Sequence, residues 1–66
     1  MKTNVDVREA THIKTRDGRI EKIAGKWGID SEGHLAKPSE GGFGCVTIHG
    51  ERISMWDAMA YYKDGV

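Results

Sequence analysis

Apolar and polar residues alternate along the first half of this chain, on both sides of an Asp-Gly pair at positions 17–18. Ile13 and Thr15 precede the pair, Ile20 follows it, and charged residues occupy the neighbouring positions. A period of two is typical of a strand with one buried face, and Asp-Gly between two such runs is a strong signal for a tight turn. The pattern therefore predicts a hairpin over residues 11–24 with a two-residue type I′ turn.

A two-residue turn also predicts which side chains share a face. Arg16 would lie opposite Arg19, on a solvent face that also carries Glu21, while the apolar side chains point to the core. Basic side chains on one pleated surface suit phosphate contacts, and arginine can also hydrogen-bond guanine edges, although an ordinary solvent-facing sheet carries such charges too. The predicted nucleic-acid-binding residues are Lys14, Arg16, Arg19, Lys22 and Lys26.

Two further extended stretches follow the hairpin. Residues 26–36 surround a turn signal at 30–33, and residues 43–53 are rich in β-forming residues with a turn expected at 49–51. The segment between them, 37–42, has the composition of a loop. The chain therefore adds further short strands to the predicted hairpin.

The last part of the chain has the pattern of an amphipathic helix. Ser54 followed by Asp57 resembles a capping box, and Gly65 lies where a helix would end. The apolar stripe expected to face the sheet comprises Met55, Trp56, Met59, Ala60 and Tyr62. The sequence therefore predicts an α+β fold, a small antiparallel sheet of three to five strands with one C-terminal amphipathic helix, residues 54–64, packed on one face.

Length and composition limit the organisation further. The 66 residues form a single small domain, 1–66, in which residues 1–9 are expected to be a flexible arm, an edge strand or the contact of a homodimer. The single cysteine, Cys45, excludes an internal disulfide. A polar N-terminus without a long apolar run favours a cytoplasmic protein with no membrane partner.

The charge balance limits the choice of partner. Ten basic and ten acidic residues give a formal net charge of zero, which argues against a surface that attracts nucleic acid over its whole area. The charges are unevenly spread, because residues 12–26 are mainly basic and residues 38–66 mainly acidic. The basic hairpin therefore stays the best candidate surface.

Residues that could carry chemistry are scattered. Cys45 and His49 would share a strand face, whereas His12 and His34 lie elsewhere, and zinc sites use four ligands at recognisable spacings. A Cys–His nucleophile also needs an orienting third group in a cleft. The glycine-rich segment 41–44 lacks the lysine and following helix of a phosphate loop. We therefore expect no enzyme activity, no metal and no cofactor.

The predicted order of elements, a sheet followed by one helix with basic residues on the outer sheet face, resembles the AP2-type domain. It is also similar to the arm-binding domains of phage integrases, over residues 11–63. This resemblance implies that the sheet enters a major groove. It rests on element order alone, so no family residues are transferred.

Two functions of different classes remain open. The first is a small regulatory protein, of phage or mobile-element origin, that binds DNA or RNA through the basic hairpin. The alternative is a protein-binding inhibitor module, comparable in scale to anti-defence or anti-CRISPR proteins, that uses a mixed-charge surface with aromatic anchors. The candidate partner-contact residues are Trp27, Phe43 and Tyr61.

Overall fold

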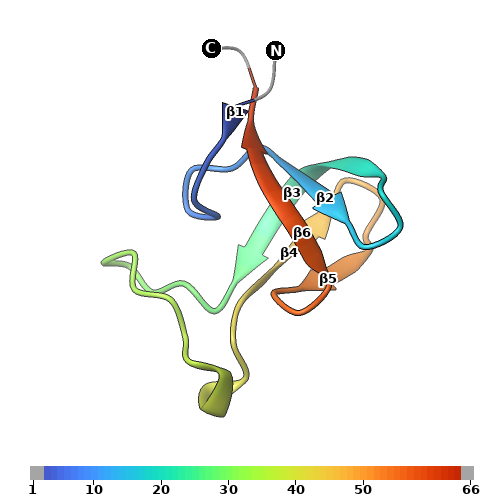
Figure 1. Ribbon diagram of the computed structural model, residues 1–66. Coiled ribbons are helices and arrows are strands. Elements are labelled where there is room, and N and C mark those ends of the chain that lie inside the picture. Colours follow the sequence, from blue (N-terminus) through green and yellow to red (C-terminus); the bar gives the residue numbers. More distant parts are fainter. Residues whose placement is uncertain (1–2, 65–66) are drawn as a thin grey trace.

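The computed structural model describes residues 3–64, which form one antiparallel sheet (Figure 1). Its six strands lie in the order β1-β6-β2-β3-β4-β5. They are β1 (Thr3–Asn4), β2 (His12–Thr15), β3 (Ile20–Trp27), β4 (Gly44–Thr47), β5 (Arg52–Ser54) and β6 (Ala58–Lys63). Strands β2 to β5 follow one another as a meander, and β6 returns to pair with β2.

The sheet bends so that its inner side encloses the core. The bend lies in the long strand β3, whose register with β4 shifts between Ile23 and Gly25, and β6 crosses in front of β3 and β4 in Figure 1. Bulges of this kind increase the local twist of a sheet. The buried apolar cluster comprises Val7, Ile13, Cys45 and Ile53, with Ile23, Ile29, Leu35, Phe43, Ala58 and Tyr61 packed around it.

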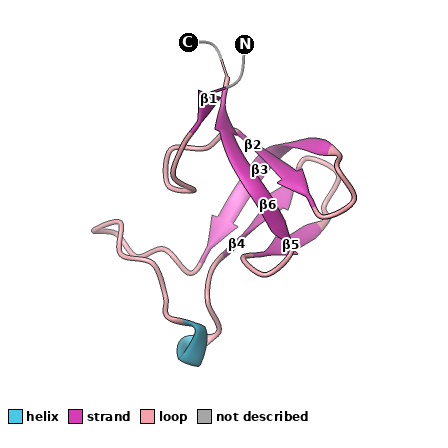
Figure 2. Cartoon of the chain, in the orientation of Figure 1, coloured by secondary structure: helices cyan, strands magenta, loops and turns pink. Residues whose placement is uncertain are grey.

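The C-terminal helix is absent, so the prediction of an α+β fold is wrong. The only helical element among residues 3–64 is the short 3-10 turn Pro38–Glu40, coloured cyan in Figure 2. Ser54 and Asp57 instead form the turn between β5 and β6, in which the Asp57 amide donates to the Ser54 carbonyl at 3.0 Å. Gly65 lies outside the described residues.

Strand pairing explains why residues 58–63 are not helical. A helix of about ten residues is marginal without packing, whereas β6 forms backbone ladders with β1 on one side and β2 on the other. The adjacent tyrosines Tyr61 and Tyr62 also favour a strand. Because the helix is absent, the element order no longer resembles that of the AP2-type domain or the integrase arm-binding domains.

Two hairpin turns, at 15–19 and 47–51, share one construction. Each starts with a buried threonine whose amide donates to the carbonyl four residues later, at 2.8 and 2.9 Å. Its hydroxyl accepts the amide N–H of that same later residue, at 3.1 and 3.2 Å. Gly18 and Gly50 take the fourth position with φ of 93° and 82°, so the recurring pattern Thr-x-x-Gly, in TRDGR and TIHGE, specifies both turns.

The first of these turns corrects the predicted hairpin register. Asp17 does not adopt positive φ, as a type I′ turn would require, and the loop instead has three residues with glycine last. Ile13 therefore pairs with Glu21, and Lys14 pairs with Ile20. A slip of one residue exchanges the faces of a strand, so Ile20 is 48% exposed rather than in the core.

A long excursion, residues 28–43, connects β3 to β4 and projects from the sheet at the lower left of Figure 1. Ile29 and Leu35 bridge within it and pack against the core. At the opposite edge of the sheet, β1 pairs with β6, so this part of the N-terminal segment is an edge strand. Within residues 3–64, no helix has the length and apolar character needed to span a membrane.

Candidate nucleic-acid interface

The outer side of β6, β2 and β3 brings together side chains that are far apart in the sequence. Tyr62 pairs with His12, and His12 pairs with Lys22 on the next strand. Asn4 pairs with Tyr62 and extends the row onto β1. Directly paired residues project from the same side of a sheet, so Asn4, Tyr62, His12 and Lys22 form one row across four strands.

A second row runs beside the first. Ala60 pairs with Lys14, which in turn pairs with Ile20. The inner side of the same strands is clearly different, because Ile13 has no exposed surface and its partner Tyr61 packs against the core. We call the two outer rows together, Asn4, Tyr62, His12, Lys22, Ala60, Lys14 and Ile20, the outer face.

The two lysines of the outer face, Lys14 and Lys22, have no ion-pair partner within residues 3–64. The corrected register turns Glu21 to the side of Ile13, which removes the one acidic group that the sequence had placed among these bases. The outer face therefore carries two lysines without a neighbouring acid in either row.

The ring of His12 is held in place at its edge. Its Nδ1 and the Thr11 hydroxyl form a hydrogen bond of 2.8 Å, and the Thr11 hydroxyl also accepts the Asp64 amide N–H at 2.9 Å. Both His12 and Tyr62 are half-buried residues. Paired positions on neighbouring strands therefore place two aromatic side chains next to each other on this side of the sheet.

The two predicted arginines lie elsewhere and have acidic partners. Arg16 donates to the Trp56 carbonyl at 2.6 Å and lies 3.8 Å from the Asp57 carboxylate. Arg19 lies 3.0 Å from Asp17 and 3.2 Å from Glu51. These contacts tie the β2–β3 turn to the β4–β5 turn and to the chain before β6.

These ion pairs line a charged groove of about 420 Å³. The Thr15 hydroxyl and then the Arg19 guanidinium lower the pKa of Asp17, and the hydrogen bonds from Arg19 to Glu51 and Asp17 raise the pKa of the guanidinium. Acids and arginines alternate along its walls, which are Thr15, Arg16, Asp17, Arg19, Glu51, Arg52, Ile53 and Asp57. Arg16 and Arg19 are paired with these acids, and three arginines against three carboxylates leave no net charge to attract phosphate.

The fifth predicted basic residue, Lys26, is also engaged. It pairs with Cys45 beyond the bulge of β3, and its ammonium donates to the Arg8 carbonyl at 3.2 Å. The Arg8 guanidinium binds Asp6 with an Nε–Oδ1 distance of 2.8 Å, and hydrogen bonds from Arg8 lower the pKa of Asp6 to about 2. Of the five predicted residues, the structure therefore brings only Lys14 and Lys22 onto one free face.

The candidate aromatic contacts are divided between core and surface. Phe43 and Tyr61 pack against the buried cluster, and burial raises the pKa of Tyr61 to about 12. Trp27 is half-buried on the outer side of the sheet, with the Arg52 guanidinium 4.7 Å from the centre of its ring. The large apolar side chains that are most exposed are Ile20, Ile48, Trp56 and Met59.

The cysteine and histidines form no shared site in the described part of the chain. Cys45 is buried, and burial raises the pKa of its thiol. His49 lies exposed in the β4–β5 turn, and residues 3–64 contain no cluster of three side chains suited to hold a metal.

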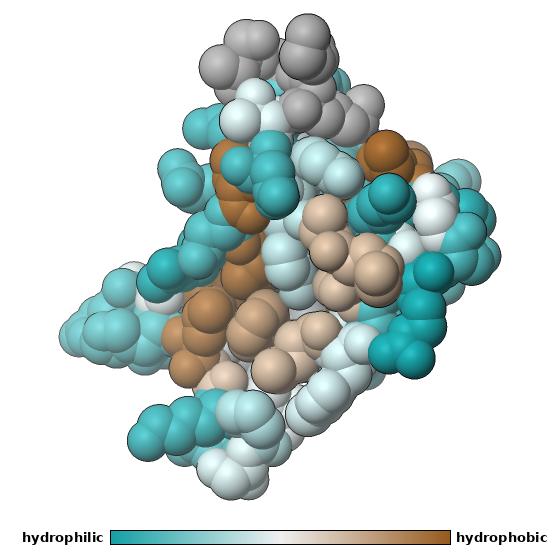
Figure 3. Space-filling model, in the orientation of Figure 1, coloured by the Kyte–Doolittle hydropathy of each residue, from teal (hydrophilic) through white to brown (hydrophobic). Residues whose placement is uncertain are grey.

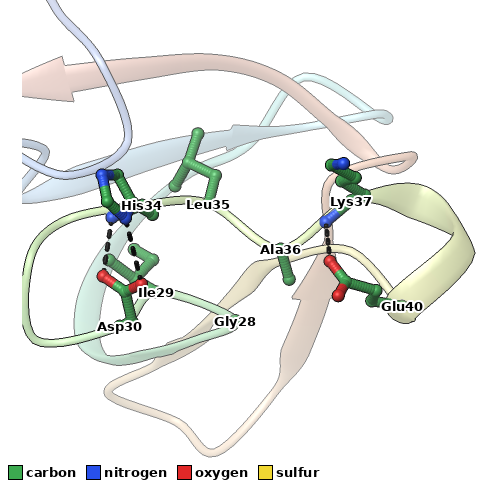
Figure 4. Close-up of a pocket in the computed structure, with 8 residues that line it drawn as sticks. All are labelled: Gly28, Ile29, Asp30, His34, Leu35, Ala36, Lys37 and Glu40. Atoms are coloured by element: carbon green, nitrogen blue, oxygen red, sulfur yellow. Dashed lines mark hydrogen bonds and ion pairs between the residues drawn. The ribbon is translucent and has the colours of Figure 1, made fainter.

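A separate, open pocket of about 560 Å³ lies within the 28–43 excursion (Figure 4). Asp30 accepts the His34 amide N–H at 2.8 Å, which is the main reason that its pKa is lowered, and the imidazole lies 3.3 Å from the same carboxylate. Glu40 accepts the Lys37 amide N–H at the other end. Apolar side chains gather where this segment leaves the sheet (Figure 3), so the pocket combines apolar lining residues with two ends whose carboxylates, Asp30 and Glu40, already accept hydrogen bonds from neighbouring residues.

No protein-family model matches the chain, and no curated protein or solved structure matches it either. The outer face also contains Asn4, His12 and Tyr62, none of which was among the predicted nucleic-acid-binding residues. The adjacent tyrosines of the segment AMAYYK, which favour a strand, were the available signal for Tyr62, but the helical spacing of the methionines and alanines obscured it.

Proposed function

We propose that this protein is a non-enzymatic binding protein that holds single-stranded nucleic acid on the outer face of β6, β2 and β3. The observation that carries the proposal is the row in which Tyr62, His12 and Lys22 occupy paired positions on three neighbouring strands. Two rings and then a basic side chain follow one another there across three strands.

The chemistry of a single strand suits this arrangement. Unpaired bases stack on Tyr and His rings, and each base–aromatic stack contributes about 1–3 kcal/mol. Lys14 and Lys22 lie beside the rings, where an ammonium group reaches the phosphates that follow a stacked base. The small side chain of Ala60, paired with Lys14, keeps this surface low enough for a nucleotide to lie flat.

A duplex fits the structure less well. Reading base edges in a major groove needs long donors such as arginine, and the guanidinium groups of Arg16 and Arg19 bind carboxylates within the protein. A net charge of zero also gives little of the general attraction on which duplex binding depends. Stacking, which needs exposed bases, is therefore the stronger source of affinity here.

An assigned amide-shift titration with a mixed-sequence single strand tests the proposal. We expect shifts confined to β6, β2 and the first half of β3, and a decrease in affinity with salt of about −0.7 in log–log slope per phosphate contact. Tyr62→Ala should weaken binding by about 1–3 kcal/mol, whereas Tyr62→Phe, which keeps the ring, should bind nearly as wild type. Shifts restricted to other surfaces, or equal affinities of the two variants, would refute the proposal.

A second candidate, recognition of a protein partner, is supported by one observation. Trp56 and Met59 are 55% and 63% exposed, on the β5–β6 turn and the start of β6. Large exposed apolar side chains often anchor protein interfaces. If this candidate is correct, Trp56→Ala with Met59→Ala should abolish capture of that partner and leave the single-strand titration unchanged.

A further inference from the structure

We infer that the bound strand continues along β3 to a second stacking site formed by Trp27 and Arg52. This inference rests on the proposed function and extends it from one row of side chains to a path. The path runs from Lys22 past Gly25 to the ring of Trp27, all on the outer side of β3.

Strand pairing places these residues on the outer side. Gly25 pairs with Val46, which pairs with Arg52, whereas the neighbouring pair of Cys45 and Ile53 is buried. Because side chains alternate along each strand, Gly25 and Arg52 share the solvent side of the sheet. Trp27 pairs with Gly44, the next outward position of β4.

Gly44 and Gly25 differ in the space around them, that is, in what an added Cβ would meet. A Cβ on Gly44 would lie 2.3 Å from the Trp27 ring, so this glycine is needed for the ring to lie flat on the sheet. A Cβ on Gly25 would meet nothing within 4 Å, and Gly25 is absent from the glycines with positive φ. Neither a steric contact nor a positive φ therefore requires glycine at position 25.

Glycine within a strand weakens the sheet and often marks a bulge or a place where a ligand approaches the backbone closely, and Gly25 lies at the register shift of β3 against β4. Gly25 follows the exposed residue Ala24, so two successive small residues leave the outer side of β3 open between Lys22 and Trp27. This open surface leads to the Trp27 ring, and the Arg52 guanidinium lies over that ring, 4.7 Å from its centroid.

The Trp27–Arg52 pair suits a nucleotide. The indole ring lies against Gly44 and carries the Arg52 guanidinium over its ring, so a base stacks on the outer side of the guanidinium plane, which can also bind a phosphate. Within residues 3–64, Arg52 has no carboxylate within ion-pair distance, in contrast to Arg16 and Arg19. The second site therefore repeats the combination found in the outer face, an aromatic ring beside a basic side chain that has no ion-pair partner.

The separation of the two sites sets the length of strand that reaches both. The five residue-to-residue steps of strand from Lys22 to Trp27 span about 17 Å. Stacked nucleotides spaced at roughly 3.4 Å would need about five units to cover that span. An oligothymidylate of four nucleotides can thus occupy one site, whereas one of ten can occupy both.

The test uses the full chain with Trp56→Phe, so that Trp27 is the only indole. We expect the ten-nucleotide oligothymidylate to quench Trp27 fluorescence and to bind at least about five-fold more tightly than the four-nucleotide probe, as expected for one additional stacked base. Gly25→Glu should remove that advantage and leave the affinity for the short probe unchanged. Gly25→Ala, a folding control, and Ser31→Glu, which adds the same charge on the excursion, should both retain it.

Each outcome separates the two proposals. If the short probe binds through the outer face but the long probe gains nothing, or if Gly25→Glu behaves as Ser31→Glu does, the second site is wrong and the first stands. If neither probe binds, both proposals fail. Arg52→Ala provides an independent check should Gly25→Glu not fold, because loss of the guanidinium should weaken only the long probe.

Discussion

The turn and the middle of the β2–β3 hairpin both carry two basic residues, but they use them differently. At the turn, Arg16 and Arg19 bind carboxylates of the later turns at 3.8 and 3.2 Å. In the middle, Lys14 and Lys22 project from the outer face without an ion-pair partner within residues 3–64. Basic charge therefore joins loops at one end of the hairpin and stays available at the other.

The difference shows that the neighbours of a charge matter more than its sign. An arginine between two acids has its donors occupied, and exposed pairs of this kind add little stability. A lysine beside an aromatic ring forms a pair that can bind both parts of a nucleotide, the base through the ring and the phosphate through the ammonium group. Counting bases along the hairpin could not distinguish these two roles, because Glu51 and Asp57, which bind Arg19 and Arg16, come from turns about 32 and 41 residues away.

The largest expected effect tests the strand that carries both regions. Ile13 has no exposed surface, and Ile13→Ala should reduce the free energy of unfolding by about 2–5 kcal/mol. Lys14→Ala, one residue along β2, should change it by less than about 0.5 kcal/mol. Urea denaturation measures both, and similar losses at the two positions would show that the inner and outer sides of β2 are wrongly assigned.

The next effect concerns the construction of the turns. The buried Thr47 hydroxyl accepts the amides of His49 and Glu51, both at 3.2 Å. Thr47→Val keeps the shape but leaves these donors without their partner, so we expect a loss of about 1–3 kcal/mol in the free energy of unfolding. Thr15→Val should behave alike in the same urea experiment. A neutral Thr47→Val would contradict the hydroxyl's role in the turn.

These turns also show how much of the structure could be predicted. The Asp-Gly pair located the first hairpin correctly, and a turn was expected at 49–51, because glycine in these positions has a local cause. The register was missed because Thr15 hydrogen-bonds across the loop and selects a three-residue turn. That interaction is visible in the sequence only when TRDGR is compared with TIHGE.

The C-terminal error has a different cause. The spacing of Met55, Trp56, Met59 and Ala60 fits a helical stripe, but β6 gains its stability from backbone pairing with a strand more than 40 residues earlier, as in the pair Lys14–Ala60. Local propensity cannot report such a partner. The same long-range pairing creates the outer face, so the site and the misjudged strand could only be recognised together.

Binding should separate the two basic regions directly. Lys14→Ala with Lys22→Ala should reduce the log–log salt slope for a single strand by about 1.4, two contacts at about 0.7 each. Arg16→Ala with Arg19→Ala removes the same formal charge and should leave the slope unchanged, because these groups already have acidic partners. Fluorescence anisotropy at several salt concentrations measures both. Equal slopes in the two double variants would remove the distinction between them.

A smaller effect is expected in acid. Hydrogen bonds from Arg8 lower the pKa of Asp6 to about 2, below its unfolded value of roughly 3.9. A lowered folded pKa means that Asp6 contributes stability above the unfolded value and loses it as the pH falls towards 2. The Tm of wild type should therefore exceed that of Asp6→Asn near neutral pH, and the gap should close by about pH 2. A gap that persists there would contradict the assigned pairing.

The smallest effect is expected at Met59, which a C-terminal helix would bury. In the strand arrangement Met59 lies at the register shift of β6 against β2 and is 63% exposed. Met59→Ala should change the free energy of unfolding by less than about 0.5 kcal/mol, whereas a buried methionine would cost about 2–5 kcal/mol. Met59 is the extra residue that lets Ala58 face inward and Ala60 outward, so a large loss there would overturn the register that places Tyr62 beside His12.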